Sequence, residues 1–359
     1  MPRTSVCLIW LMLCLPTWAQ PRITLDATGD TEYASIAEAL LFADSLNRPA
    51  VVRIGPGTLF ERDIVFDPSA PISSVAEITI LGTPPGLTII DGSGAPGTFL
   101  SIRRSAAVVE LRDLVVQNYA AGSGAQSVLD IGPANSVLLE DIVIHDIAPG
   151  FGGADSAVTA VRIGNTALQP LFANCRVVVE GSGPAIDVNR VFLSNSLIAA
   201  NDIALESLAT AAGINSTIVG RITGVQVGFH SYQNCVLSRV PEVNAVVSRC
   251  VLPSEPAPPV FATDNTIIGD PLFVAAAQGD FRLSPGSPAI DAADLSALDT
   301  GNGFIGSFLD ANDDFRLIDD PATPDTGTGE RAFLDIGAFE YQPVDCRGDV
   351  NLDGAVTDS

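Results

Sequence analysis

The amino-acid sequence predicts an all-β protein whose strands stack as the coils of a β-solenoid. One short phrase returns along the middle of the chain: a charged residue or Asn, a small or polar residue, and an aliphatic residue two positions later. From Cys175 onward the copies lie 15 to 21 residues apart with no helical stripe between them, which is typical of solenoid repeats. The 32 glycines, the 25 prolines and the low aromatic content of 6% indicate many turns around a core of small aliphatic side chains. The copies are Arg112–Val115, Glu140–Val143, Asn174–Val177, Asn195–Ile198, Asn215–Ile218, Asn234–Leu237 and Arg249–Leu252.

The chain begins with the features of a secretion signal. Arg3 precedes the apolar run Val6–Leu15, and the small residues of a cleavage site follow at Thr17–Ala19. The run is too short to span a membrane, and no later run reaches about 18 apolar residues. We therefore expect a signal peptide over residues 1–19 and a secreted protein without a membrane span, with an uncleaved anchor as the alternative. The net charge of −24 argues against nucleic acid and anionic membranes as partners, because both attract basic surfaces.

The next segment predicts a cap for the open end of the solenoid. Tyr33–Ala43 has apolar residues at helical spacing, Ala50–Ile54 is a strand phrase and Gly55–Thr58 is a tight turn. An uncovered first coil would expose core side chains and strand edges, so we expect a short helix to cover it. Glu77–Gly82 and Leu87–Gly92 are predicted to be the first strands of the coil.

Within each phrase the small residue and the aliphatic residue share one side of the strand, because successive side chains alternate. Stacked coils would therefore form two inward columns, one of small or polar residues and one of aliphatic residues. We predict that the first column contains Asp113, Asp141, Cys175, Ser196, Ser216, Cys235 and Cys250. We predict that the second contains Val115, Val143, Val177, Ile198, Ile218, Leu237 and Leu252.

Three cysteines fall in the first column. We expect Cys175, Cys235 and Cys250 to form a ladder of buried thiols interleaved with Ser196 and Ser216. A Cys235–Cys250 disulfide is the open alternative, because stacked strands lie about 4.8 Å apart, within the Cα separation that a bridge tolerates. Metal binding by these cysteines is not expected, since the sequence has no Cys-x-x-Cys or histidine partner.

A polar column follows about five residues beyond each small residue, where the strands would turn. It is either a solvated turn ladder, whose side chains hold backbone groups, or a shallow groove that binds sugar hydroxyls. The candidate substrate-binding residues are Asn118, Asp146, Glu180, Asn201 and Arg221.

His145, Asp146 and Glu180 are the candidate catalytic residues near this column. A pair of carboxylates can hydrolyse a glycosidic bond, and carboxylates on neighbouring strands would raise one pKa, as acid catalysis requires. The alternative is that the His145–Asp146 pair is only a feature of the turn.

Two acidic segments near the end of the sequence have spacings that suit calcium. Asp310–Arg316 alternates oxygen ligands, but Phe315 replaces the glycine that lets a calcium loop turn, so we expect a solvated acidic turn there. Residues 349–358 match the start of a twelve-residue calcium loop and contain the required Gly354. The sequence stops before the twelfth position, so we expect residues 345–359 to be an incomplete, truncated loop that binds calcium weakly or not at all. The candidate ligands are Asp349, Asn351, Asp353 and the carbonyl of Ala355.

The segment from Tyr33 to Glu61 resembles the N-terminal cap of pectin-lyase-like proteins, and the strand phrases after it resemble the first coils of that family. The resemblance implies a right-handed, single-stranded parallel β-helix over residues 20–268 with a short N-terminal capping helix. It also implies that a pectate lyase would need an acidic calcium cluster with an arginine or lysine base, and a polygalacturonase a Gly-His-Gly motif. This chain has no lysine, no Gly-His-Gly and only two histidines, which leaves catalysis unassigned.

Three spaced blocks, Gly269–Phe273, Asp280–Asp291 and Asp335–Glu340, closely resemble the C-terminal region of bacterial choice-of-anchor Q domain proteins. The resemblance implies that residues 269–342 finish the helix in a bacterial protein that is secreted or associated with the cell surface. The tail from Arg347 resembles the first repeat of a type I dockerin, which implies a cohesin-type protein as a partner.

Together these patterns predict a secreted β-helix protein that binds or helps to process extracellular polysaccharide and is attached to an assembly through its tail. One alternative is an active polysaccharide lyase or glycoside hydrolase, which would require an open cleft lined by Asp146, Glu180 and an arginine such as Arg221. A second alternative is an adhesion-like surface protein without sugar selectivity. The longer insertion at Phe151–Gln169 is where a working face is first expected.

Overall fold

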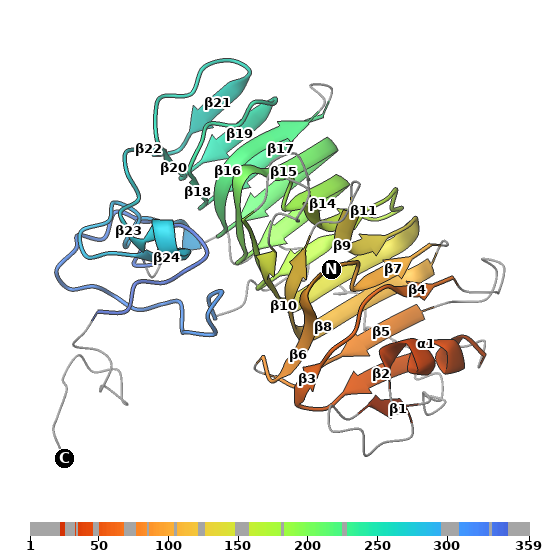
Figure 1. The fold of residues 1–359 in the computed structure, drawn as a ribbon. Coiled ribbons are helices and arrows are strands. Elements are labelled where there is room, and N and C mark those ends of the chain that lie inside the picture. The colour runs from red at the N-terminus through yellow and green to blue at the C-terminus, as the bar shows by residue number, and fades with distance from the viewer. Residues whose placement is uncertain are drawn as a thin grey trace, which may run out of the picture.

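A computed structural model describes residues 22–25, 33, 35–45, 50–67, 77–84, 86–103, 106–120, 126–147, 158–180, 183–224, 228–295, 309–329 and 332–343. Most of these residues form parallel strands that wind into one long coil, and an antiparallel hairpin lies beside it (Figure 1). The predicted right-handed parallel β-helix is confirmed.

Successive turns of the coil stack their strands in parallel on faces that we call A, B and C. Face A contains β1 (Arg22–Leu25), β2 (Ala50–Ile54), β5 (Glu77–Leu81), β12 (Leu171–Ala173), β17 (His230–Gln233), β19 (Ala245–Ser248) and β21 (Val260–Thr263). Face B contains β3 (Gly57–Leu59), β6 (Thr88–Pro96), β13 (Arg176–Val179), β18 (Val236–Leu237), β20 (Val251–Leu252) and β22 (Ile267–Ile268). Face C contains β4 (Ile64–Phe66), β7 (Leu100–Ile102), β9 (Gln126–Ile131) and β11 (Val158–Ile163). Longer strands cross corners between faces: β8 (Ala106–Ala120), β10 (Ala134–Ile147), β14 (Ile186–Ser194), β15 (Leu197–Ile214) and β16 (Thr217–Gly224).

A left-handed turn residue joins face A to face B on successive coils. Its φ lies between 47° and 57°, a region that Asn and Asp enter with less strain than other residues that carry a Cβ atom. The recurring phrase in the sequence is therefore the signature of this turn. The turn residues are Asp113, Asp141, Asn174, Asn195, Asn215, Asn234 and Arg249.

The strand register corrects the predicted inward columns by one residue on the first coils. Val177 pairs with Ile144, so Asp141 is the counterpart of the turn residue Asn174. The prediction had matched each early Asp to the small residue after the turn, and a slip of one residue reverses which side chains point inward. The residues wrongly predicted to be inside are Asp113, Asp141, Val115 and Val143, and those buried in their place are Leu114, Ile142, Val116 and Ile144. The later members of both columns are buried as predicted.

The predicted thiol ladder is confirmed. Cys175, Cys235 and Cys250 are buried and free, so the alternative of a Cys235–Cys250 disulfide is not realised in the structure. The serines between them carry hydrogen bonds along the ladder. The amide of Cys175 donates to Ser196 Oγ at 3.1 Å, and the amide of Ser196 donates to Ser216 Oγ at 3.2 Å.

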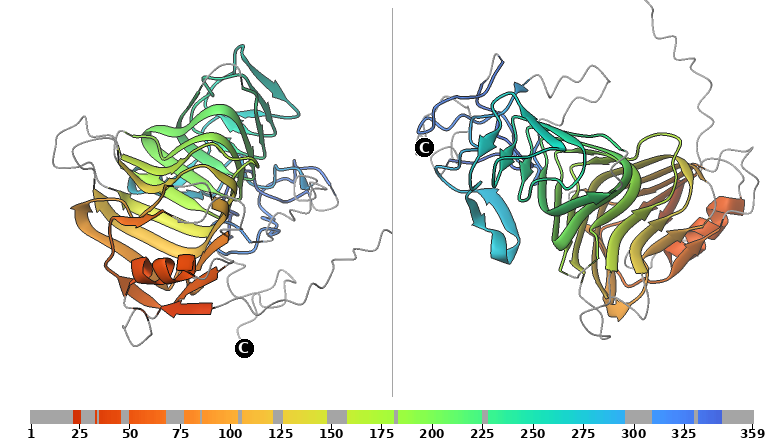
Figure 2. Two further views of the ribbon diagram at one scale, coloured as in Figure 1. Left: turned by 90° about the vertical axis from the view of Figure 1, so that its right-hand side faces the viewer. Right: turned by 90° about the horizontal axis from the view of Figure 1, so that it is seen from above.

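The helix α1 (Ile36–Ser45) covers the N-terminal end of the coil, as predicted (Figures 1 and 2). Ile36, Ala39 and Leu40 are buried in the main core, and the helix contacts β2 and β4. The amide of Ile36 donates to the Glu61 carboxylate at 2.7 Å, which fixes the first turn of the helix to the first coil.

The chain after β22 folds back along the side of the coil (Figures 1 and 2). There β23 (Phe273–Ala275), a 3-10 turn (Ala276–Gln278) and β24 (Asp280–Leu283) form a hairpin, and the other described residues of this segment are largely irregular. We call residues 269–342 the cover, because they bury outward-facing apolar side chains of face B on the later coils. The buried residues of this contact include Leu197, Val236 and Val251 on the coil and Phe281, Ile290, Ile336, Ala338 and Phe339 on the cover.

Polar contacts fix the cover to the coil. Arg316 is fully buried, and its guanidinium donates to the carbonyl of Gly337 at 2.7 Å and to Asn195 Oδ1 at 3.3 Å. Asn234 exchanges two hydrogen bonds with the backbone of Asp294, at 2.9 and 3.0 Å. Because Asn195 and Asn234 are turn residues of the coil, the same turn that shapes each coil also holds the cover.

The turn Asp310–Arg316 is the predicted solvated turn only in its middle, where Asp313, Asp314 and Phe315 are exposed, whereas its two ends are buried. Asp310 is 1% exposed, and its carboxylate accepts hydrogen bonds from the amides of Asn312, Asp314 and Glu340 at 2.7, 3.1 and 2.9 Å. A carboxylate that satisfies buried backbone amides can itself be buried. The acidic turn therefore has a structural role within the cover.

Candidate functional site

Strands of face B that lie beside and partly against the cover form a groove on the outer side of this face. The strands and the hairpin β23–β24 enclose it, and its volume is about 850 Å³. Its floor consists of small apolar side chains, because outward positions of neighbouring strands come into register there. The floor residues are Val143, Val178, Ala199 and Val219.

Four of the predicted site residues line this groove: His145, Asp146, Glu180 and Asn201. His145 Nδ1 lies 2.8 Å from Asp146 Oδ2, and the two side chains are 35% and 56% exposed. Asn201 Nδ2 donates to the carbonyl of Glu180 at 2.6 Å. The end of β10 and the ends of β13 and of the first part of β15 thus bring these polar groups to one rim.

The other two predicted residues lie outside the groove. Asn118 donates to the Asp91 carboxylate at 2.6 Å. Burial opposes the ionised form of Asp91, but this hydrogen bond and others from nearby groups lower its pKa overall. Arg221 makes a two-pronged contact with Asp202, at 2.7 and 3.0 Å. Both side chains are therefore occupied by contacts within the coil.

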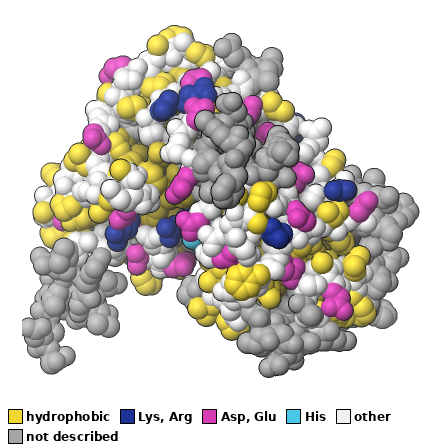
Figure 3. Space-filling model, viewed as in Figure 1, with side chains coloured by type: hydrophobic (Ala, Val, Ile, Leu, Met, Phe, Trp, Pro, Cys, Tyr) yellow, Lys and Arg dark blue, Asp and Glu magenta, His cyan; other side chains and the backbone are white. Residues whose placement is uncertain are grey.

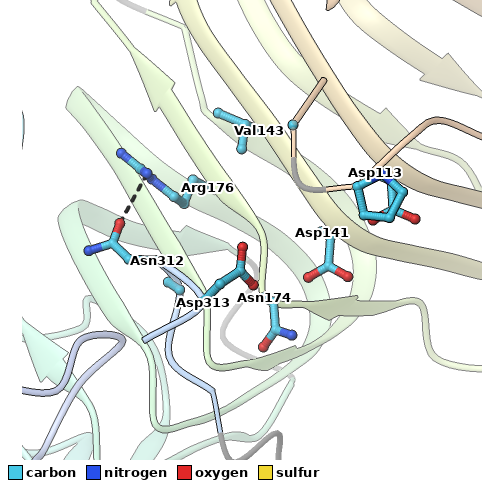
Figure 4. A pocket seen from close by; sticks show the side chains of 10 residues that line it. Asp113, Asp141, Val143, Asn174, Arg176, Asn312 and Asp313 are labelled. Carbon is cyan, nitrogen blue, oxygen red and sulfur yellow. Dashed lines mark hydrogen bonds between the residues drawn. The ribbon is translucent and has the colours of Figure 1, made fainter. Parts of the chain in front are cut away.

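A smaller pocket of about 420 Å³ adjoins the groove and shares Val143 and Arg176 with it (Figure 4). Three turn residues of successive coils line one side of the pocket: Asp113, Asp141 and Asn174. They reach the outer surface because their left-handed backbone turns them away from the core.

The cover forms the opposite side of this pocket. Asn312 and Asp313 line it, and Asn312 Oδ1 accepts a hydrogen bond from Arg176 Nη1 at 3.1 Å (Figure 4). The pocket therefore combines acidic side chains from the coil and from the cover with one arginine. On the face of the molecule drawn in Figure 3, acidic side chains are likewise more frequent than basic ones.

The carboxyl groups of Asp113 and Asp141 in the pocket are less acidic than usual. Burial raises the pKa of Asp141 to about 6, helped by the negative charges of Glu140 and Asp113 and opposed by a hydrogen bond from Asn174. Burial and Glu140 also raise the pKa of Asp113. A carboxyl group that titrates near neutral pH can both donate and accept protons.

Arg176 is the candidate that sequence reasoning missed. It lies in an outward row between Val143 and Leu197, at the boundary between open and covered coils. Burial lowers its pKa, although Asp310 and Asp280 oppose this effect. Its Nε has no hydrogen-bond partner among the residues that the structure describes. The available signal was a single basic residue in an outward row whose neighbouring members, Val143, Leu197 and Thr217, are uncharged.

The insertion at Phe151–Gln169 does not contribute the expected working face in its described part. There β11 adds a strand to face C, between β9 and β14, and lines neither pocket. The predicted calcium ligands of the tail, Asp349, Asn351, Asp353 and Ala355, lie outside the described residues, as does the predicted signal peptide. In the described part of the chain, no helix is long and apolar enough to cross a membrane.

No family model and no curated protein matches this chain. Among solved structures, pectate lyase Pel9A is similar over 90% of this chain and 97% of its own, with 13% identity and a TM-score of 0.35. Pectin methylesterase from carrot matches over 69% and 78% of the two chains, with 16% identity and a TM-score of 0.27. The pectin methylesterase of rice weevil matches over 70% and 84%, with 13% identity and a TM-score of 0.26. These neighbours are parallel β-helix proteins, while the choice-of-anchor Q and dockerin resemblances stay predictions.

Proposed function

We propose that the groove on face B binds a linear extracellular polysaccharide. The observation that carries this proposal is an apolar floor flanked by polar side chains along its rims. Sugar rings have the same division, because their C–H faces are apolar and their hydroxyl groups need hydrogen-bond partners. An open groove also suits a polymer, which can enter from the side and extend beyond both ends.

The rims supply both kinds of hydrogen-bonding group. Arg176 lines the groove, and its guanidinium offers hydrogen-bond donors there. Asp146 and Glu180 offer acceptors, and Gln278 on the hairpin offers both. A few fixed polar groups above an apolar surface are the usual composition of a ligand site.

The charge of the site favours a neutral sugar chain. Asp113, Asp141 and Asp313 gather at one end, and the whole chain carries a formal charge of −24. Negative charge on the ligand would be repelled unless a divalent cation bridged the two. We therefore expect neutral polymers to bind directly and acidic polymers to require calcium.

Binding to an array of neutral and acidic polysaccharides, with and without calcium, tests the proposal. Arg176→Gln should weaken binding at least about tenfold, because a hydrogen bond from a charged donor contributes about 1.5 kcal/mol or more. Arg221→Gln is the matched control, since it removes the same charge outside the groove. Equal loss in both variants would contradict the proposal, and binding without any selectivity would favour the adhesion-like alternative.

The raised pKa of Asp141 favours a second candidate function, cleavage of the bound chain. Near pH 6 a protonated Asp141 could act as a general acid, with Asp113 as its carboxylate neighbour. Release of reducing ends and of unsaturated products, measured from pH 5 to 8 on the polymers that bind, distinguishes hydrolysis from elimination. Asp141→Asn should then abolish turnover while binding persists. Turnover that survives this change would exclude Asp141 as the acid.

We also propose, from the sequence, that the protein is exported and attached to a larger assembly. The signal-like residues 1–19 and the calcium-loop-like residues 345–359 support this proposal. Binding of the chain to an immobilised cohesin, compared with an Asp349→Asn, Asp353→Asn variant, tests the attachment. Equal binding by both proteins would refute a role of this loop.

A further inference from the structure

Three carboxylates meet in the cover, away from the groove. Asp291 follows β24, and Asp319 and Asp325 lie on the segment after the turn at Asp310. One carboxylate oxygen of each lies within 4.8 Å of the others. Asp291 is buried, whereas Asp319 and Asp325 are exposed. The cluster therefore has a closed inner end and an outer end that solvent can reach.

Asp291 differs from the other buried acids of the cover. It is fully buried, and neither of its carboxylate oxygens has a hydrogen-bond partner of good geometry among the described residues. Asp335 is just as buried, but its two oxygens accept hydrogen bonds from the amides of Asp291 and Tyr341. Asp310 accepts three such bonds. A buried carboxylate without partners is costly, so it needs a positive charge or a proton.

Neighbouring negative charges increase the free-energy cost of burying the Asp291 carboxylate. Asp319, Asp325 and Asp320 each place a negative charge close to the buried Asp291 carboxylate. The carboxylate of Asp320 is itself engaged, since it accepts hydrogen bonds from the amide of Ala322 and the hydroxyl of Thr323. Repulsion among the cluster would be relieved by a bound cation.

The backbone holds this arrangement in place. The carbonyl of Asp291 accepts hydrogen bonds from the amides of Thr326 and Gly327 at 2.8 and 2.9 Å, directly after Asp325. The amide of Asp291 donates to Asp335 Oδ1 at 2.8 Å. Asp291 and Asp325 are thus fixed next to each other before any ion arrives, which lowers the entropic cost of binding.

We propose that Asp291, Asp319 and Asp325 form a calcium site that ties the cover together. Calcium takes six to eight oxygen ligands at about 2.3–2.6 Å, so oxygens on opposite sides of the ion lie up to about 5 Å apart. The 4.8 Å limit of this cluster fits that span. Water and backbone carbonyl oxygens complete the coordination at the exposed end.

The site has a consequence for the groove, because the cover that it ties together also forms one wall of the groove. That wall includes Gln278 and Phe281, and the adjoining pocket includes Asn312 and Asp313. None of the three proposed ligands lines the groove, so calcium binding requires no sugar and can be tested separately from the proposed function.

Calorimetric titration of calcium into the full chain, after treatment with a chelator, tests the site. Asp319→Asn and Asp325→Asn change exposed side chains and so should fold; each should weaken calcium binding at least about tenfold. Asp291→Asn should have the largest effect. Glu255→Gln, an exposed change of the same charge, is the control and should bind like wild type.

The calcium-loop-like tail needs its own variant, Asp349→Asn with Asp353→Asn, because it could bind the same ion. This variant should retain the site. Because an ion that binds only the folded protein stabilises it, the variant should also melt at a higher temperature with calcium than without it. The proposal is overturned if calcium binding disappears in the tail variant, if Asp319→Asn and Asp325→Asn bind like wild type, or if wild type binds no calcium.

Discussion

Asn234 joins the coil to the cover, and its replacement has an effect that can be worked out from the structure. Its side chain is buried, and its Nδ2 donates to Asn215 Oδ1 and to the carbonyl of Asp294, both at 2.9 Å. Its Oδ1 accepts a hydrogen bond from the amide of Asp294 at 3.0 Å. Its backbone has φ of 51°, which glycine also adopts freely.

Asn234→Gly therefore keeps the turn and removes three hydrogen bonds. At about 1 kcal/mol each, plus the cost of leaving buried partners unsatisfied, the loss should be about 3–5 kcal/mol. Asn234→Ala should cost about 1–2 kcal/mol more, because alanine is strained in the left-handed region. Asn174→Gly, at the same turn on an open coil, is the matched control and should cost only about 1 kcal/mol.

Hydrogen exchange measured by mass spectrometry is the suitable assay, since solenoids need not unfold in one step. A loss of about 3 kcal/mol should speed exchange of the Asp294 amide more than about a hundredfold. The Asn174→Gly control should leave this amide almost unchanged. An Asn234→Gly protein that exchanges like wild type would refute the view that this side chain holds the cover.

Three further predictions follow from buried groups. The three thiols of the ladder should resist alkylation in the folded protein, because all three are buried and burial raises the pKa of Cys235 and, to about 12, that of Cys175. Rapid labelling without denaturant, measured by mass spectrometry, would contradict this. Burial raises the pKa of Glu340 to about 8, so the folded state holds this proton more tightly than the unfolded state does. The stabilisation of the folded state by this proton is complete below about pH 4 and is lost as the pH rises towards 8. Melting temperatures measured from pH 4 to 9 test this, and a melting temperature that rises steadily with pH would count against it. Arg316→Met should destabilise the cover by about 3–5 kcal/mol in thermal melts, because it leaves buried carbonyls unpaired. The control Arg282→Met changes an exposed side chain and should cost less than about 1 kcal/mol. Equal effects of the two changes would argue against a special role of Arg316.

The sequence was sufficient to predict the coil and its cap because both depend on local patterns. Alternating strand phrases and a short amphipathic segment predicted β2 and β5 to within a residue or two and α1 at its place. The buried thiol ladder also followed, because Cys175, Cys235 and Cys250 occupy one slot of the repeat. These features require only that neighbouring coils be alike.

The sequence failed where the meaning of a residue depended on its φ angle. Asp113 and Asp141 were matched to Cys175, but they share the left-handed turn with Asn174. Composition alone cannot separate these two alignments, because an Asp suits a turn and a small polar slot equally well. The error concealed the acidic pocket, since it directed both carboxylates inward.

The groove itself could not be predicted, because the cover defines it from a distant part of the chain. Arg176 contacts Asn312, which lies far away in sequence. Arg176 lines the groove, whereas Arg221 lies outside it and contacts Asp202. No repeat pattern reveals this contact with Asp202. Outward apolar residues such as Leu197 were the one local sign that something must cover the later coils.

The change from open to covered strands on face B sets the length of the groove independently of its chemistry. Arg176 stands at that boundary, with Val143 on the open side and Leu197 beneath the cover. Inserting or deleting one complete coil on the open side would lengthen or shorten the groove by one strand spacing, about 4.8 Å, without disturbing the cover. Duplication of a single repeat would thus suffice to fit a longer stretch of ligand, so the length of the groove can change in steps of one coil.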